Sequence, residues 1–438
     1  MNKYISTAIA LFASVSLAFG QANISPAKPQ SQKIIIMGAT IHTGDGVVIP
    51  NGYLILEKGK ITGVGDATVV KFSTDGAKLI TANGKHIYPG FISSITNLGL
   101  VEIESVKATL DERELGDNNA HIRALIAYNT DSKVPATLRS NGILMAQITP
   151  SGGSIAGSSS VVQLDAWNWE DAAIKKEDAM HVNWPTTPRG RGGFGGGRFG
   201  GLTAITGDPN ERTNNAIAEL NTFFSQAKMY SENTPAVANS RLAAMKGLFN
   251  GSQKLFITAN DQKDIVAAVN FAKKHNITPV IVGGDEAYLL TGFLKSNNVI
   301  VVVKQPHALP GNTDDDVNMP YKNASVLNNA GVTVVLSIDG FWQQRNLPFM
   351  AGTASAWGMS KEDALKTITL NAAKAMGIDK ITGSLAIGKD ATFFISAGDA
   401  LDMIGNKVEE AFIQGRSINL DNLHKQLDKK FSDKYGIK

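Results

Sequence analysis

The sequence predicts an α/β protein in which a barrel of strands and helices is joined to a small unit made of strands. Between residues 87 and 385, short runs rich in valine and isoleucine alternate with amphipathic stretches. Continuous apolar strands that alternate with helices indicate a parallel sheet buried on both faces. Strands at this spacing over about 300 residues favour a barrel over an open sheet. Near both ends of the chain, by contrast, short strands are separated by glycine-containing turns.

The first 20 residues have the features of a signal peptide. Lys3 supplies a positive charge, Ile5 to Phe19 form an apolar run, and small residues before Gln21 suit cleavage at that point. A buried N-terminal helix is the alternative interpretation. The run is too short for a comfortable transmembrane helix, and the absence of cysteine from the chain fits an oxidising compartment. We therefore expect an exported protein, periplasmic or secreted, with a polar linker at residues 21–32.

The elements of the fold are expected in a simple order along the chain. A β-rich unit at residues 33–86 comes first, and strands at 386–420 complete it from the far end. A lysine-rich helix at 421–438 closes the chain. The clearest strands of the barrel are expected at 142–150, 254–260, 278–284, 298–304 and 332–340. The amphipathic segments 261–276 and 285–297 are expected to form helices between them.

A glycine-rich insertion interrupts the barrel at residues 189–201. It contains eight glycines, three arginines and two phenylalanines in thirteen residues. Such a segment can bind nucleic acid, because arginine and aromatic side chains stack on bases. The chain is exported by our interpretation and has a net charge of only +3, which indicates no strong attraction to nucleic acid or anionic membranes. We therefore expect a flexible surface loop.

Several motifs together resemble the amidohydrolase superfamily, and within it the imidazolonepropionase-like group. They are "GATIHTGDG" and "NGYLILEKGKITGVG" near the start, "IYPGFI" at 87–92, "TLNAAKAMGI" at 369–378 and "GSLAIGKDATFFI" at 383–395. The resemblance implies a (β/α)8 TIM-like barrel at 87–385. It also implies a small β-sandwich domain built from both ends of the chain, at 33–86 and 386–420.

The resemblance also implies a divalent metal at the barrel mouth, held by histidines and an aspartate. The family's His-x-His pair falls here on Ile95 and Asn97, and its histidine on strand five falls on Thr258. The strand-six segment "VIVGGDEA" has glycines where a histidine could stand. Of the expected ligands only Asp339 remains, and it would also be the catalytic acid/base residue. Loss of these histidines should abolish tight binding of zinc or iron.

Two groups of residues could replace the lost ligands. His307 lies three residues after a barrel strand and could bind a metal together with Asp339, although a lone loop histidine is more often structural. A carboxylate-rich site for a hard cation would require four acidic side chains to converge, namely Glu102, Glu104, Asp285 and Asp339. The serine-rich segment 151–160 lacks a Gly-x-Ser-x-Gly motif and a nearby histidine, so a serine hydrolase is not expected.

Two functions therefore stay open. The first is an active metal-dependent hydrolase of non-peptide or cyclic amide C–N bonds, with Asp339 as acid/base and a rearranged zinc or iron site. The second, which we favour, is a non-catalytic relative whose pocket at Ile95, Asn97 and Thr258 binds a small molecule. Such a pseudoenzyme could form a homo-oligomer or pair with an active paralogue. We expect no cofactor unless the first function holds, no nucleic-acid partner and no membrane span.

Overall fold

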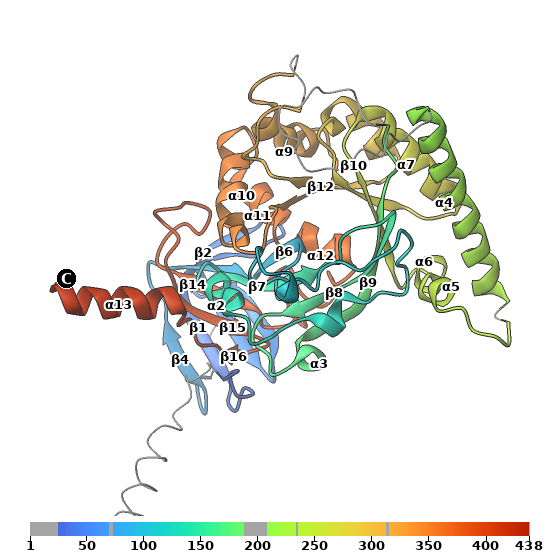
Figure 1. Cartoon of the computed structure of the whole chain (residues 1–438). Helices are drawn as coiled ribbons and strands as arrows, with labels where there is room; N and C mark the ends of the chain where they lie inside the picture. Colours follow the sequence, from blue (N-terminus) through green and yellow to red (C-terminus); the bar gives the residue numbers. More distant parts are fainter. Residues whose placement is uncertain (1–24, 70–72, 188–207, 234, 312–314, 438) are drawn as a thin grey trace, which may run out of the picture.

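A computed structural model describes residues 25–69, 73–187, 208–233, 235–311 and 315–437 (Figure 1). The predicted signal peptide and the glycine-rich segment 189–201 lie outside the described residues. The described chain has two parts, a barrel sheet and a sheet formed by the two ends of the chain. No described helix is both long enough and apolar enough to cross a bilayer.

Eight strands form the barrel sheet. In spatial order they are β6 (Phe91–Thr96), β7 (Ile143–Ile148), β8 (Ile155–Gln163), β9 (Ala173–Asn183), β10 (Lys254–Ala259), β11 (Pro279–Gly283), β12 (Ile300–Lys304) and β13 (Val334–Ser337). The Ser337 hydroxyl donates a hydrogen bond of 2.5 Å to the carbonyl of Ser94, so the last strand lies beside the first and the barrel is nearly closed. The five strands predicted from valine-rich and isoleucine-rich runs are confirmed as β7 and β10 to β13.

The barrel departs from the predicted all-parallel (β/α)8 pattern at β8. This strand runs antiparallel to both of its neighbours, β7 and β9, while the other adjacent pairs are parallel. The reason is the length of the connections. Only residues 149–154 join β7 to β8, whereas a parallel crossover needs a dozen residues or more. Both β8 and β9 are absent from the strands predicted by sequence.

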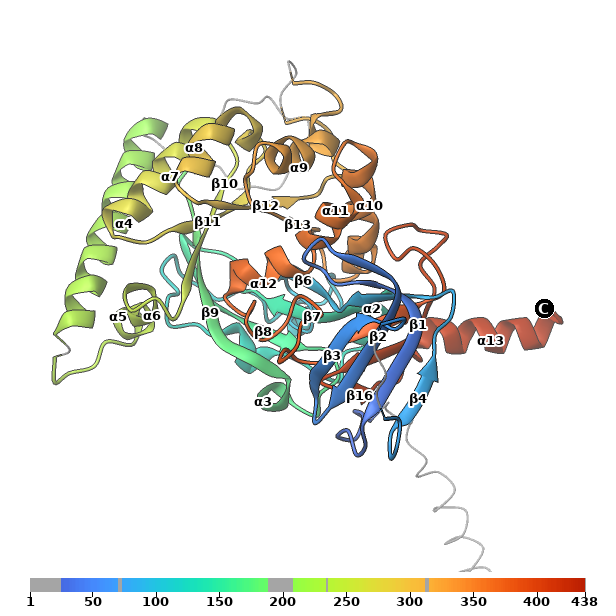
Figure 2. The same cartoon turned by 180° about the vertical axis from the view of Figure 1, so that it is seen from behind.

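Helices cover much of the outside of the barrel (Figures 1 and 2). The α-helices are α2 (Lys133–Arg139), α3 (Trp169–Ala172), α4 (Pro209–Glu232), α5 (Ser240–Ala244), α6 (Lys246–Phe249), α7 (Gln262–Lys274), α8 (Thr291–Ser296), α9 (Met319–Asn329), α10 (Leu347–Ala356), α11 (Lys361–Thr367), α12 (Leu370–Met376) and α13 (Leu423–Tyr435). Helix α7 buries Ile265, Ala268 and Ala272 on one face, the spacing of an amphipathic helix. Helix α13 extends away from the body.

One end of the barrel is closed by α12. Its Ala372 and Met376 pack into the same apolar cluster as side chains from inside the barrel. The Asn371 amide donates to the carbonyl of Val334 at 2.9 Å, and Val334 is the first residue of β13. Helix α12 therefore covers the N-terminal ends of the strands. A ligand must enter at the opposite end, where the strands end and the loops begin.

The two ends of the chain meet in a second sheet. It contains β1 (Ile34–His42), β2 (Val48–Glu57), β3 (Lys60–Asp66), β4 (Lys78–Thr81), β5 (His86–Pro89), β14 (Phe393–Ser396), β15 (Val408–Ile413) and β16 (Arg416–Ser417). The resemblance implied two facing sheets, but these strands form a single sheet around one core. The sheet curls so that β3 approaches the segment before β14. There the backbone N–H of Ile61 donates to the carbonyl of Lys389 at 2.9 Å.

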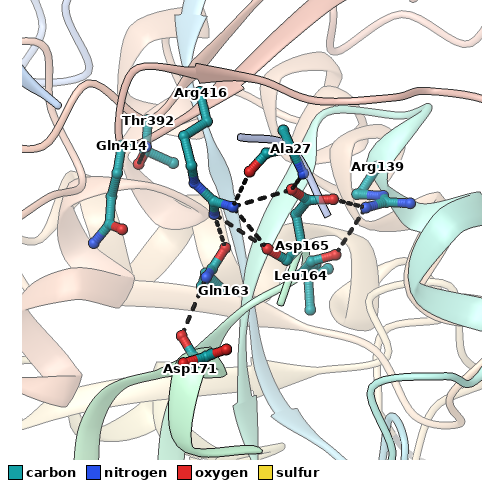
Figure 3. Close-up of polar contacts among 9 residues, drawn as sticks. All are labelled: Ala27, Arg139, Gln163, Leu164, Asp165, Asp171, Thr392, Gln414 and Arg416. Atoms are coloured by element: carbon teal, nitrogen blue, oxygen red, sulfur yellow. Dashed lines mark hydrogen bonds and ion pairs between the residues drawn. The ribbon is translucent and has the colours of Figure 1, made fainter. Parts of the chain in front are cut away.

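A buried ion cluster joins the sheet to the barrel (Figure 3). Asp165, just after β8, has a side chain that is only 1% exposed and lies between Arg139 of α2 and Arg416 of β16. Its carboxylate is 2.5 Å from Arg139 Nη1 and 3.3 Å from Arg416 Nη1. It also accepts a 2.9 Å hydrogen bond from the backbone N–H of Ala27. One carboxylate therefore connects the barrel, the terminal sheet and the first described residues.

Candidate functional site

A cavity of about 250 Å³ opens at the C-terminal ends of the barrel strands. Its walls come from the ends of β10, β11 and β12 and from the loops that follow them and β13. The polar residues that line it are Thr258, Asn260, Asp285, Tyr288, Lys304, Gln305, Asp315, Asn323 and Asp339. This is the end at which barrel enzymes carry their catalytic groups. The cavity is therefore the candidate functional site.

Asp339 faces a lysine in this cavity. Lys304 is the last residue of β12, and Asp339 follows β13, its neighbour in the sheet. The Lys304 Nζ atom lies 2.5 Å from Asp339 Oδ1. The backbone N–H of Asp339 also donates to the side-chain carbonyl of Gln305 at 3.1 Å. The predicted acid/base residue is thus held by a cation that belongs to the chain itself.

The predicted positions on strands five and six also lie in the cavity wall. Thr258 near the end of β10 contributes a hydroxyl group. Gly283 at the end of β11 has φ of +93°, and a Cβ atom at this position would lie 2.0 Å from Asn260 Oδ1. A histidine could therefore stand at position 283 only if the Asn260 side chain moved. The amide of Asn260 occupies space that a strand-six ligand would need.

Ile95 and Asn97 are not among the residues that line the cavity. Ile95 has φ of +52°, a strained conformation for a β-branched residue, and its side chain packs against the apolar cluster inside the barrel. The Asn97 amide donates to Glu112 Oε2 at 2.7 Å. These two residues therefore lie outside the lining of the cavity that Thr258 and Asp339 share.

The two alternative metal sites do not assemble. The His307 Nε2 atom lies 2.7 Å from Thr353 Oγ1, and His307 does not line the cavity. Glu102 accepts hydrogen bonds from Asn129 and Ser132 outside the cavity, whereas Asp285 does line it. Within the described ranges, no group of three or more histidine, aspartate or glutamate side chains is arranged to hold a metal ion. The described lining of the mouth offers a hydroxyl, amides and the carboxylates of Asp285, Asp315 and Asp339, but no histidine, and this set does not fit a zinc or iron centre.

Asp285 and Asn323 also line the cavity, the first as an exposed residue and the second as a buried one. Loss of surrounding water raises the pKa of the Asp285 carboxyl above its usual value, and the nearby Asp261 and Glu286 raise it further. Asn323 is 3% exposed, and its Nδ2 donates to the carbonyl of Gly284 at 2.9 Å. This bond fixes the orientation of the amide. The Asn323 Oδ1 atom is buried and has no hydrogen-bond partner among the described residues.

A buried polar cluster inside the barrel was missed by sequence. The Ser159 hydroxyl of β8 lies 2.7 Å from Asp178 Oδ1 and 2.8 Å from His181 Nε2, both on β9. Gln147 of β7 donates to Asp178 Oδ2 at 2.7 Å. Burial raises the pKa of Asp178 to about 6 and lowers the pKa of His181 to about 3. The sequence analysis did not single out His181, which lies within β9.

The sequence of this chain is similar to one family model and to two known enzymes. Residues 321–421 match the model of the Amidohydrolase family. The imidazolonepropionase of Flavobacterium psychrophilum is 26% identical over 216 residues, which are 43% of this chain and 51% of that protein. The chain thus spans about half the length of this relative. The imidazolonepropionase of Symbiobacterium thermophilum is 24% identical over 388 residues, 80% of this chain and 85% of that protein.

A solved structure shares the fold across nearly its whole length. The amidohydrolase from Thermotoga maritima superposes with a TM-score of 0.74 at 20% identity, covering 88% of this chain and 99% of that one. At this identity the likeness concerns the fold alone. With the family match and the two relatives, it confirms that the chain resembles the amidohydrolase superfamily, as its sequence motifs indicate.

Proposed function

We propose that this chain is an exported amidohydrolase-family protein that binds a small molecule at the barrel mouth and has lost metal-dependent hydrolysis. The observation that carries the proposal is the ion pair between Lys304 and Asp339 in the cavity wall. In the family, the residue at the Asp339 position faces a divalent metal and accepts a proton from the attacking water. In this chain the carboxylate faces an ammonium group at 2.5 Å.

The physical argument is electrostatic. An ammonium beside the carboxylate balances its charge and repels a second cation, and this holds although the Lys304 and Asp339 side chains are 27% and 52% exposed. The cavity also holds the carboxylates of Asp285 and Asp315, whereas Thr258 offers a neutral hydroxyl and Asn260 a neutral amide. Such oxygens are poor ligands for zinc. The lysine therefore takes over the charge-balancing role of the metal without supplying an activated water.

One observation favours the catalytic alternative. Asp285 lines the cavity with a raised pKa, and perturbed carboxyl groups in clefts are frequent acids or bases. In that alternative Asp285 and Asp339 would share proton transfer in a hydrolase of cyclic amides. We favour ligand binding, because this alternative needs a rearranged metal site and the donors at the mouth do not fit one.

Hydrolysis assays separate the two functions. Purified protein incubated with imidazolonepropionate and other cyclic amides, with zinc or manganese supplied, should give no turnover above a protein-free blank. The control is the same assay on Asp339→Ala. Metal-dependent turnover by the wild type that this variant lacks would establish the catalytic alternative.

Export is part of the same proposal. The charged, apolar and small residues of positions 1–20 and the absence of cysteine support it. N-terminal sequencing of the mature protein from a periplasmic or culture fraction should begin at Gln21. Full-length protein confined to the cytoplasm would exclude export. Self-association, or pairing with an active paralogue, stays a prediction.

A further inference from the structure

We propose that a second, smaller cavity beside the buried ion cluster binds a small oxyanion of the phosphate or sulfate type. This cavity has a volume of about 70 Å³, and its described wall shares no residue with the wall of the mouth cavity. The wall comes from Pro26, residues 130–132, helix α2 and residues 164–166 after β8. An anion here would bind independently of the small molecule proposed for the barrel mouth.

The first observation is an excess of positive charge in the buried ion cluster. The side chains of Arg139 and Arg416 are 7% and 13% exposed, and both pair with the single carboxylate of Asp165. Burial lowers the pKa of Arg139 and the nearby Arg416 lowers it further, while Asp165 acts in the opposite direction. A buried charge is costly unless a partner of opposite sign balances it. The cluster holds one guanidinium group more than it has carboxylates, so an additional anion would stabilise it.

The second observation is a guanidinium nitrogen that reaches this cavity without a partner. The Nη1 atom of Arg139 donates to the carbonyl of Leu164 and to Asp165, and these are its contacts in Figure 3. The Nε atom is buried and has no partner among the described residues. The Nη2 atom likewise donates to no described residue, but it keeps accessible surface, and Arg139 lines the cavity. Its two N–H groups therefore call for acceptors inside the cavity.

The size and charge of the cavity fit a small oxyanion. A single water molecule needs about 10–15 Å³ by the same measure, so about 70 Å³ holds a few waters or one small anion, but no larger organic body. Lys133 also lines the cavity and adds a second positive charge to its wall. The wall includes one further described carboxylate besides Asp165, that of Asp131, which is an exposed residue. Surrounding water and salt weaken its repulsion of an anion.

Other occupants satisfy the site less well. Water can accept hydrogen bonds from Arg139 Nη2, but it leaves the excess positive charge of the cluster unbalanced. Chloride balances the charge, but a single spherical ion lacks the several oxygens that match the planar guanidinium group. A phosphate or sulfate ion supplies both the negative charge and several acceptors. A cation would meet the guanidinium group of Arg139 and is excluded by repulsion.

Calorimetric titration of the purified protein in phosphate-free buffer tests this site, with sodium sulfate, sodium phosphate and sodium chloride as probes at matched ionic strength. We expect sulfate and phosphate to bind once per chain, about tenfold or more tightly than chloride, because only they accept several N–H groups of a guanidinium. Arg139→Gln should abolish this binding. That variant also breaks the ion cluster and could fail to fold, so Lys133→Met provides the second test. It should weaken sulfate binding about threefold to tenfold, because it removes a positive charge from the wall.

The matched control is Lys263→Met, which removes the charge of an exposed lysine on α7 outside the cavity wall. It should change sulfate affinity less than about twofold. Equal losses in Lys133→Met and Lys263→Met would overturn the site, because the general charge of the protein would then explain binding. Equal affinity for sulfate and chloride would overturn the oxyanion class. If the wild type bound neither sulfate nor phosphate saturably, the cavity would hold water alone and the proposal would be wrong.

Discussion

Replacing Asp165 by alanine should destabilise the protein by about 3–5 kcal/mol, the cost of removing one partner of a buried ion pair. The substitution leaves two guanidinium groups, those of Arg139 and Arg416, buried without their carboxylate. The two arginine side chains are only 7% and 13% exposed, so water cannot replace the lost partner. The backbone N–H of Ala27 loses its acceptor as well. Urea denaturation of the wild type and the variant measures the difference.

A surface ion pair provides the control for this prediction. Lys361 lies 2.6 Å from Asp399, but its side chain is 70% exposed. Lys361→Ala should therefore cost less than about 1 kcal/mol. If Asp165→Ala were as mild as the control, the buried cluster would not hold the terminal sheet, the barrel and the N-terminal segment together.

The buried polar cluster inside the barrel should give two opposite pH effects between pH 7 and pH 4, about 3 kcal/mol from His181 and about 2 kcal/mol from Asp178. The pKa of His181 is lowered to about 3. The unfolded chain takes up this proton near pH 6.5 and the folded chain does not. The stability that His181 contributes is therefore present above pH 6.5 and is lost as the pH falls.

Asp178 acts in the other direction. Its folded-state pKa is raised from 3.8 to about 6, so the folded chain takes up the proton first. Its contribution to stability is greatest below pH 3.8 and is lost as the pH rises through 6. In the wild type the two effects largely cancel between pH 4 and 6.

Single variants should expose each effect. On going from pH 7 to pH 4, His181→Gln should gain about 3 kcal/mol relative to the wild type, because only the Asp178 effect remains. Asp178→Asn should lose about 2 kcal/mol relative to the wild type over the same range. The double variant should stay within about 1 kcal/mol of the wild type over this range. Urea denaturation at each pH measures these differences, and single variants whose curves parallel the wild type would contradict the account.

The strands that were predicted from the sequence and those that were missed differ in whether their side chains need hydrogen-bond partners. The apolar side chains of a run such as "NVIVVVK" need no hydrogen-bond partners, so the composition of the run is enough to predict β12. Strand β8 reads "IAGSSSVVQ", yet all nine of its residues are buried. Ser159 can be buried because Asp178, His181 and Gln147 lie beside it. Those partners come from neighbouring strands, and local sequence does not reveal them.

The candidate site was predictable only in part for a similar reason. The motifs placed Thr258 and Asp339 at the barrel mouth, and both line the cavity. Lys304 gave no signal beyond its position at the end of a strand. Its role depends on the pairing of β12 with β13, which sets Lys304 beside Ser337 and brings it close to Asp339. Asn323, from a helix between those strands, was not predicted at all.

The central claim is that an internal lysine has replaced the metal at Asp339. Elemental analysis of the purified mature protein, wild type beside Asp339→Ala, tests it most directly. The account predicts that zinc, iron and manganese are all far below one atom per chain in both proteins, and that both remain folded. Nearly one metal atom per wild-type chain, lost in Asp339→Ala, would contradict the account and restore a rearranged metal centre.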